Sequence, residues 1–261
     1  MPAAAPSRFA RIQVAPAYQL VAEAIEREVV SGRLLPGEPV GTEADLVRQF
    51  GVNRSTVREG IRALEEGGFI ERGPDRRLYA CLPRYNRLSS RMSRALLLHE
   101  VTFRELFSVS LVLEITAAEQ AVEAATDAAI AELEENQRTL EEAGRARDAV
   151  RLSQVDFDFH VLLAKATGNR VLILSREPYS LLFFPTAELI CRRVPEGPDR
   201  MIAAHRALIE ALKARDGGAA RTWMRRHIHD WRRGFERAGR DLDEPVERVY
   251  ARTLGGTPKR E

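Results

Sequence analysis

The sequence predicts a mainly α-helical protein with two domains: a small N-terminal domain of helices and one β-hairpin, and a larger all-α antiparallel helical bundle. Apolar residues recur at helical spacing through most of residues 17–239, and one short stretch, residues 69–82, instead has the composition of two strands around a turn. A chain of 261 residues is also long enough to form more than one hydrophobic core.

The first predicted helix begins at Ala17 and ends near Gly32. Its apolar residues recur at spacings of three and four, with charged residues between them: Leu20, Val21, Ala24, Ile25 and Val29. Pro36 and Gly37 then form a turn that separates this helix from the next.

Two short helices are predicted to follow, joined by a tight turn. Thr42 and Asp45 have the spacing of a capping box, which starts the second helix, and Gly51 ends it. Asn53 is a suitable N-cap for the third helix, and Gly67 with the next glycine ends that helix.

Residues 69–82 predict a small hairpin whose turn is Gly73-Pro74-Asp75, and Pro83 marks the end of the domain. A helix, a tight turn, a second helix and a hairpin occur in this order in a winged helix-turn-helix, whose second helix lies in the major groove of DNA. The sequence therefore predicts a DNA-binding domain over residues 17–83.

Polar side chains on the outer face of the third helix and beside the hairpin turn are the expected DNA contacts. Arginine forms bidentate contacts to guanine or phosphate, and hydroxyls bind phosphate or base edges. The residues are Arg54, Ser55, Thr56, Arg58, Arg62 and Arg76. On charge pattern alone, an ordinary amphipathic helix with a solvated arginine face is an equal alternative.

Beyond Pro83, Ala, Leu, Glu and Arg dominate, and helical periodicity continues to about Gly239. Breaks in this pattern predict six or seven helices; they fall at Gly144, Gly168, Pro178, Pro185, residues 194–199 and Gly217. The full predicted organisation is a flexible segment 1–16, the DNA-binding domain 17–83, a helical domain 84–240 and a polar tail 241–261.

Composition narrows the class of protein. Lys and Arg number 40 against 38 Asp and Glu, so a nucleic-acid surface has to come from a local basic face. Cys81 and Cys191 lack the spacing of a zinc ribbon or a disulfide scaffold, which fits a reducing compartment. The first residues have no signal-peptide core and no stretch is long enough to span a bilayer, so we expect a cytoplasmic protein with no membrane partner.

Four residues of the helical domain form a candidate metal site. Asp156 and His160 are four residues apart, which places them on one face of a helix, and His205 and His227 belong to later helices. An antiparallel bundle can direct all four side chains inward. One carboxylate and three imidazoles suit a divalent ion such as Zn, Ni or Mn.

Each of these residues also has an ordinary structural interpretation. Asp156 could cap a helix, because Ser153 lies three residues earlier, and a single histidine is more often a partnered core or surface residue than a ligand. His99 and His229 are interpreted as structural or exposed, since His229 points to a different helix face from His227.

The N-terminal motifs carry a family resemblance. The stretch SGRLLPGEPVGTEADLVRQFGVNRSTVREGIRALEEGGFIERG resembles the GntR family of bacterial regulators along nearly the whole DNA-binding domain. The resemblance implies that Arg54 and Arg58 contact a double-stranded DNA operator, with Ser55 and Thr56 beside them. One departure is Ala44, where some relatives carry arginine, so the operator sequence may differ from theirs.

The helical part, from Tyr85 to Gly239, resembles the FCD ligand-binding domain of the FadR-like branch of that family. The matching stretches are DFDFH, ATGN, AHRALIEALKARD and RRHI. The resemblance implies a metal on the four residues named above and a small organic acid that completes its coordination. Ser110 stands where relatives often carry an arginine that pairs with the ligand, so Arg192 or Arg193 could supply that charge instead.

Together these observations predict a metabolite-responsive transcription regulator, a repressor that binds a palindromic operator as a homodimer. Two alternatives stay open. The metal could activate water in a hydrolase-like enzyme, with Glu114 as a base. The helical domain could also serve only for dimerisation, with a structural metal.

Overall fold

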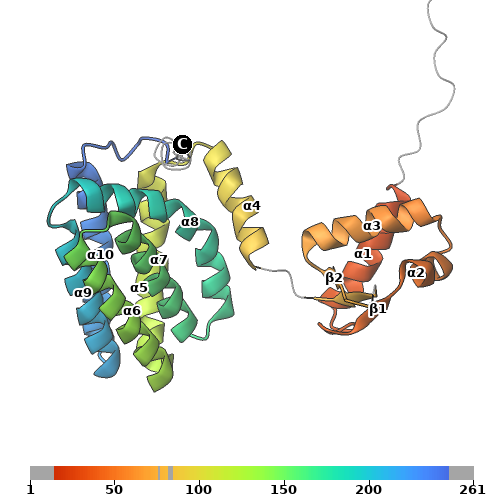
Figure 1. The fold of residues 1–261 in the computed structure, drawn as a ribbon, viewed down its shortest axis with the longest axis horizontal. Helices are drawn as coiled ribbons and strands as arrows, with labels where there is room; N and C mark the ends of the chain where they lie inside the picture. The colour runs from red at the N-terminus through yellow and green to blue at the C-terminus, as the bar shows by residue number, and fades with distance from the viewer. Residues whose placement is uncertain (1–14, 76, 82–84, 247–261) are drawn as a thin grey trace, which may run out of the picture. The chain divides into compact units, whose positions relative to one another are not determined.

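The computed structural model describes residues 15–75, 77–81 and 85–246 (Figure 1). The chain divides near residue 87 into two compact units, each with its own core. The N-terminal unit holds three helices and a small sheet, and the C-terminal unit is all-helical. The prediction of a mainly α protein with a winged helix-turn-helix and a helical bundle is confirmed.

The three helices of the N-terminal unit are α1 (Ala17–Val30), α2 (Glu43–Phe50) and α3 (Arg54–Gly67). Thr42 caps α2 in the capping box that the sequence predicts. The side chain of Asn53 accepts a hydrogen bond from a backbone N–H of the first turn of α3, so both helix starts were predicted correctly.

The core of this unit lies between α1 and α3 and under the sheet. Its buried apolar side chains are Val21, Ile25, Leu46, Val57, Ile61, Leu64, Ile70 and Leu78. Gly60 of α3 faces α1 so closely that a Cβ atom there would lie 3.0 Å from the Tyr18 carbonyl oxygen and 3.1 Å from a Val21 methyl carbon. Gly51 has a φ of 64° and forms the tight turn between α2 and α3.

The sheet has three antiparallel strands in the order β1-β3-β2: β1 (Pro39–Gly41), β2 (Ile70–Arg72) and β3 (Leu78–Ala80). Strands β2 and β3 are the predicted hairpin. Strand β1 was not predicted, because three residues starting with a proline carry no strand pattern. Proline is acceptable there because β1 is an edge strand.

Seven described helices form the C-terminal unit, consistent with the predicted six or seven. They are α4 (Tyr85–Leu98), α5 (Phe103–Ala124), α6 (Asp127–Ala146), α7 (Ala149–Ala166), α8 (Arg170–Arg193), α9 (Gly197–Lys213) and α10 (Gly217–Arg237). Figure 1 shows α5, α6, α7, α9 and α10 running side by side. The expected breaks at Pro178 and Pro185 are wrong, because α8 continues through both prolines.

The core of the C-terminal unit joins α5, α7, α9 and α10. Phe103 stacks on Phe235 with ring centroids 3.9 Å apart, and Phe159 is fully buried. Leu242 and Val246 are also buried, and the backbone N–H of Val246 donates to the carbonyl of Val101. The start of the segment expected as a polar tail therefore packs against the bundle.

None of the helices in the described part of the chain has the length and apolar character needed to cross a membrane.

Candidate DNA-reading helix and metal centre

The outer face of α3 presents the polar side chains that the sequence predicts as DNA contacts. Arg54, Ser55, Arg58 and Arg62 are exposed, and Thr56 is half-buried. Their opposite face carries the buried core residues of α3, so these side chains point away from the fold. Arg58 and Arg62 form no ion pair with another described residue, which leaves both guanidinium groups available at this surface.

The start of α3 is braced by its neighbours. Arg54 lies 3.6 Å from Glu43 of α2, and Arg72 of β2 binds both Glu43 and Glu65 of α3. These ion pairs connect α2, α3 and the hairpin across an exposed surface. The predicted contact Arg76 lies outside the described residues.

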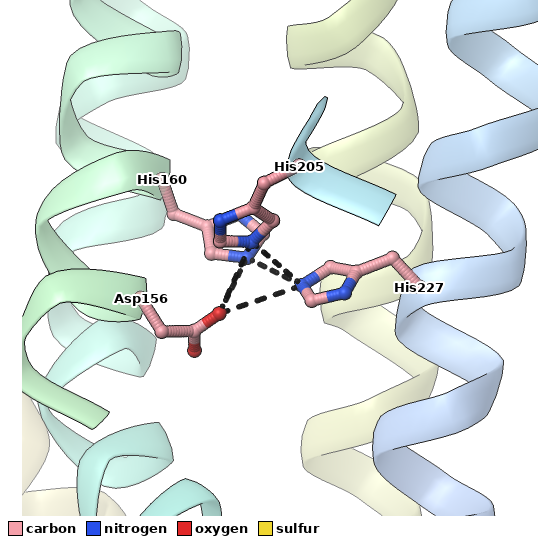
Figure 2. Close-up of side chains that lie close together, drawn as sticks. All are labelled: Asp156, His160, His205 and His227. Atoms are coloured by element: carbon pink, nitrogen blue, oxygen red, sulfur yellow. Dashed lines mark hydrogen bonds and ion pairs between the residues drawn. The ribbon is translucent and has the colours of Figure 1, made fainter. Parts of the chain in front are cut away.

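Asp156, His160, His205 and His227 converge inside the C-terminal unit. The first two lie one turn apart on α7, His205 comes from α9 and His227 from α10 (Figure 2). One ligand atom from each of the four lies within 4.8 Å of the other three. All three histidines are buried, and the ring of Phe159 stacks on that of His205 at 3.7 Å.

The spacing of these atoms suits a tetrahedral ion. The Asp156 Oδ1 atom lies 3.2 Å from Nε2 of His205, 3.6 Å from Nε2 of His227 and 4.0 Å from Nε2 of His160. Nε2 of His227 is 3.0 Å from that of His160 and 3.4 Å from that of His205. Zinc ligands at about 2.0–2.2 Å stand about 3.3–3.5 Å apart in a tetrahedron. Asp156 Oδ1 is buried without a well-aligned hydrogen bond, as an unfilled ligand position would be.

A buried carboxylate supports the cluster from behind. Glu114 of α5 accepts a hydrogen bond from Nδ1 of His160 at 2.8 Å and from Nε of Arg176 of α8 at 2.5 Å. Because Nδ1 of His160 carries the proton toward Glu114, its Nε2 presents a lone pair to the cluster. The residues present therefore fit a divalent cation.

Burial and neighbouring charges shift the pKa values of this site. Burial raises the pKa of Glu114, but the charges of Arg176 and His160 outweigh it and lower the pKa to about 2. For Asp156 burial is again outweighed, here by His205 and the other two histidines, and the net shift of the pKa is downward. Burial lowers the pKa of His205, and burial together with the charge of His205 lowers the pKa of His227 to about 3. The carboxylates are thus charged and these two imidazoles neutral at pH 7, which are the states that bind metal.

A cavity of about 810 Å³, counted to its open mouth, adjoins the cluster. Asp156, His160 and His227 line one end, together with Glu114 and Arg176. The rest of the cavity is bounded by side chains of α7, α8, α9 and α10. Its size is in the range of small-molecule sites.

Two predicted effector contacts do not line this cavity. Ser110 is buried and its hydroxyl donates to the carbonyl of Leu106, one turn back in α5. Arg193 is exposed at the end of α8. The arginine that does reach the cluster, Arg176, was missed because its contact with Glu114 spans 62 residues of sequence and no local pattern signals it. An isolated arginine in an apolar stretch was the one available sign.

Comparison with known families gives two matches. Residues 17–79 match the family described as "Bacterial regulatory proteins, gntR family", and residues 105–230 match the FCD domain. These spans correspond to the N-terminal unit and to α5–α10.

Several known proteins resemble the chain over most of its length. The HTH-type transcriptional regulator LutR of Bacillus subtilis is 30% identical over 207 residues, which cover 77% of this chain and 92% of LutR. The Glc operon transcriptional activator of Escherichia coli is 30% identical over 65% of this chain and 68% of its own length. The solved structure of Streptococcus agalactiae GntR shares the fold, with a TM-score of 0.58 at 24% identity over 83% of this chain and 99% of that one. The chain belongs to the GntR family of bacterial transcription regulators and carries an FCD effector-binding domain behind its winged helix-turn-helix.

Proposed function

We propose that this regulator represses its target genes as a homodimer on a palindromic operator, and that a small organic acid bound at a divalent metal in the FCD domain releases it. The single observation that carries the proposal is the convergence of Asp156 and three histidine Nε2 atoms at the end of a cavity large enough for a metabolite. Metal and effector then occupy one site, and the effector shifts operator affinity by its differential binding to two protein states.

The exposed face of α3 supports the DNA-binding half of the proposal. Arg58 and Arg62 lie one turn apart on that face, at a spacing that lets both reach one groove, and Ser55 is close to the positive end of the α3 dipole. Two such helices in a symmetric dimer read a palindrome whose half-sites lie one DNA turn apart. Repression relieved by the effector is the sense expected from the family.

The contacts of Glu114 argue against a hydrolase. A general base has to be within reach of the water whose proton it takes. Both carboxylate oxygens of Glu114 are already occupied, one by His160 and one by Arg176, and its pKa of about 2 makes it a weak base. The adjoining cavity argues against a purely structural metal, because three of the four candidate ligands line it.

The DNA-binding half is tested by selecting binding sites from random duplex DNA with the purified full chain. A palindromic consensus is expected. Arg58→Ala should weaken binding to the selected site by tenfold or more, since one specific arginine contact is worth about 1–3 kcal/mol. Arg145→Ala, which removes an exposed arginine of α6, is the matched control and should leave the affinity unchanged. Equal affinities for the two variants would refute the role of α3.

A further inference from the structure

The cavity beside the metal cluster is walled mainly by hydrocarbon. Its apolar lining comes from α7, α8 and α10, with one residue just after α8: Phe157, Phe183, Ile190, Val194, Ile228 and Trp231. The Phe183 and Trp231 rings meet edge to face with centroids 4.6 Å apart. The indole N–H of Trp231 donates to the Thr186 hydroxyl at 3.0 Å, so the single polar group of that ring is taken up within the wall.

Each arginine that lines the described part of the cavity is already paired with a carboxylate that lines it as well. Arg176 binds Glu114 at 2.5 Å in the interior. At the mouth, Arg200 lies 3.3 Å from Asp230, and Arg237 is paired with Glu196. The guanidinium charges are therefore neutralised locally before any ligand enters.

The remaining charge is concentrated at the metal cluster. Asp156 is the one lining carboxylate with no arginine partner among the described residues, and the histidines beside it are neutral when they bind metal. The cavity lining thus carries one net negative charge without an ion and one net positive charge with a divalent ion. That single surplus positive charge matches one carboxylate.

We propose that the effector is a monocarboxylic acid with an apolar body, such as an aryl-substituted or medium-chain alkyl acid, and that dicarboxylic acids are discriminated against. This inference rests on the proposed function, because it places the carboxylate at the metal. The hydrocarbon body lies against Phe157, Phe183 and Trp231, where burial of apolar surface favours binding. A second carboxylate would be desolvated against the same wall with no uncommitted cation to pair with.

Calorimetric titration of the zinc-loaded full chain with two matched acids tests this proposal. Hexanoate and adipate have the same number of carbons and differ at the far end, where adipate carries a second carboxylate. Hexanoate should bind at least tenfold more tightly than adipate. In a second pair, 3-phenylpropanoate should bind and 3-phenylpropan-1-ol, which lacks the carboxylate, should bind at least tenfold more weakly.

A charge-releasing variant tests the role of the paired arginines. Glu196→Gln frees Arg237 from its carboxylate at the mouth and should reduce the preference for hexanoate over adipate by at least threefold. Glu132→Gln makes the same change in net charge at an exposed site on α6 and should leave the preference unchanged. An equal preference in both variants and the wild type would overturn the charge argument.

The outcomes separate the two proposals. Zinc binding with adipate equal to or tighter than hexanoate overturns the monocarboxylate inference and leaves a metal-dependent acid sensor standing. A protein that takes up no zinc, or that takes up zinc and binds neither acid nor any other carboxylate tried, overturns the proposed function and the inference with it. Tighter binding of hexanoate that is lost when zinc is removed supports both.

Discussion

Replacing Glu114 with glutamine tests how the buried carboxylate holds the metal site together. In the wild type both oxygens accept hydrogen bonds, one from His160 and one from Arg176. A glutamine side chain keeps the shape but offers one acceptor, so its NH2 group faces either the His160 ring or the Arg176 guanidinium. The charge of Arg176 also loses its buried carboxylate partner.

The expected size of the effect follows from burial. Glu114 and Arg176 are both almost fully buried, and removing one partner of such a pair costs about 3–5 kcal/mol of stability. In a domain of this size, about 2–4 °C of melting temperature is lost per kcal/mol, which gives a decrease of roughly 6–20 °C in the metal-free protein. Because Glu114 also orients a proposed metal ligand, zinc affinity should fall by about 10–100-fold.

The assay is a thermal melt of the metal-free protein together with a zinc titration against a competing chelator. Glu119→Gln is a matched control on the same helix: it breaks a more exposed ion pair with Arg221 and should cost less than about 1 kcal/mol. Unchanged zinc affinity in a folded Glu114→Gln protein would refute the orienting role, and a melting temperature equal to that of Glu119→Gln would refute the buried pair.

Two further predictions concern stability. The metal-free protein should lose stability as the pH falls from about 6.5, because His227 stays neutral in the folded state down to a pKa of about 3 while it takes up a proton in the unfolded chain; urea unfolding between pH 8 and 5 measures this, and constant or rising stability would contradict it. Gly60→Ala should destabilise the N-terminal unit by about 1–3 kcal/mol, because the added Cβ atom meets the Tyr18 carbonyl and Val21, whereas Gly217→Ala, with open space around it, should be neutral or stabilising. Equal melting temperatures of the two variants would refute the close packing of α1 and α3.

The sequence was most informative where local chemistry decides the structure. The caps at Thr42 and Asn53 and the glycine at Gly51 fix the helix-turn-helix within a few residues, so its helices could be predicted closely. Asp156 and His160 share a helix face by spacing alone. His205 and His227 were added through family resemblance, since spacing says nothing about which helices pack together.

Features that depend on distant contacts were missed. Strand β1 is three residues long and exists because β3 pairs with it, and α8 continues through Pro178 and Pro185 although local rules predict breaks. Arg176 is recognised as part of the site once α8 is packed against α5 and α7, which brings it to Glu114. Tertiary packing overrode local preference in each of these cases.

The number of metal ions bound per chain tests the central claim most directly. Zinc content is measured for the wild type, Asp156→Ala and Asp158→Ala after equilibration with the metal and removal of the excess. Asp158 lies on the same helix but contacts Gln154 rather than the histidines, which makes it a matched control. The account predicts one ion per chain for the wild type and Asp158→Ala and a loss of binding in Asp156→Ala; a metal-free wild type, or equal zinc content in the two variants, would contradict it.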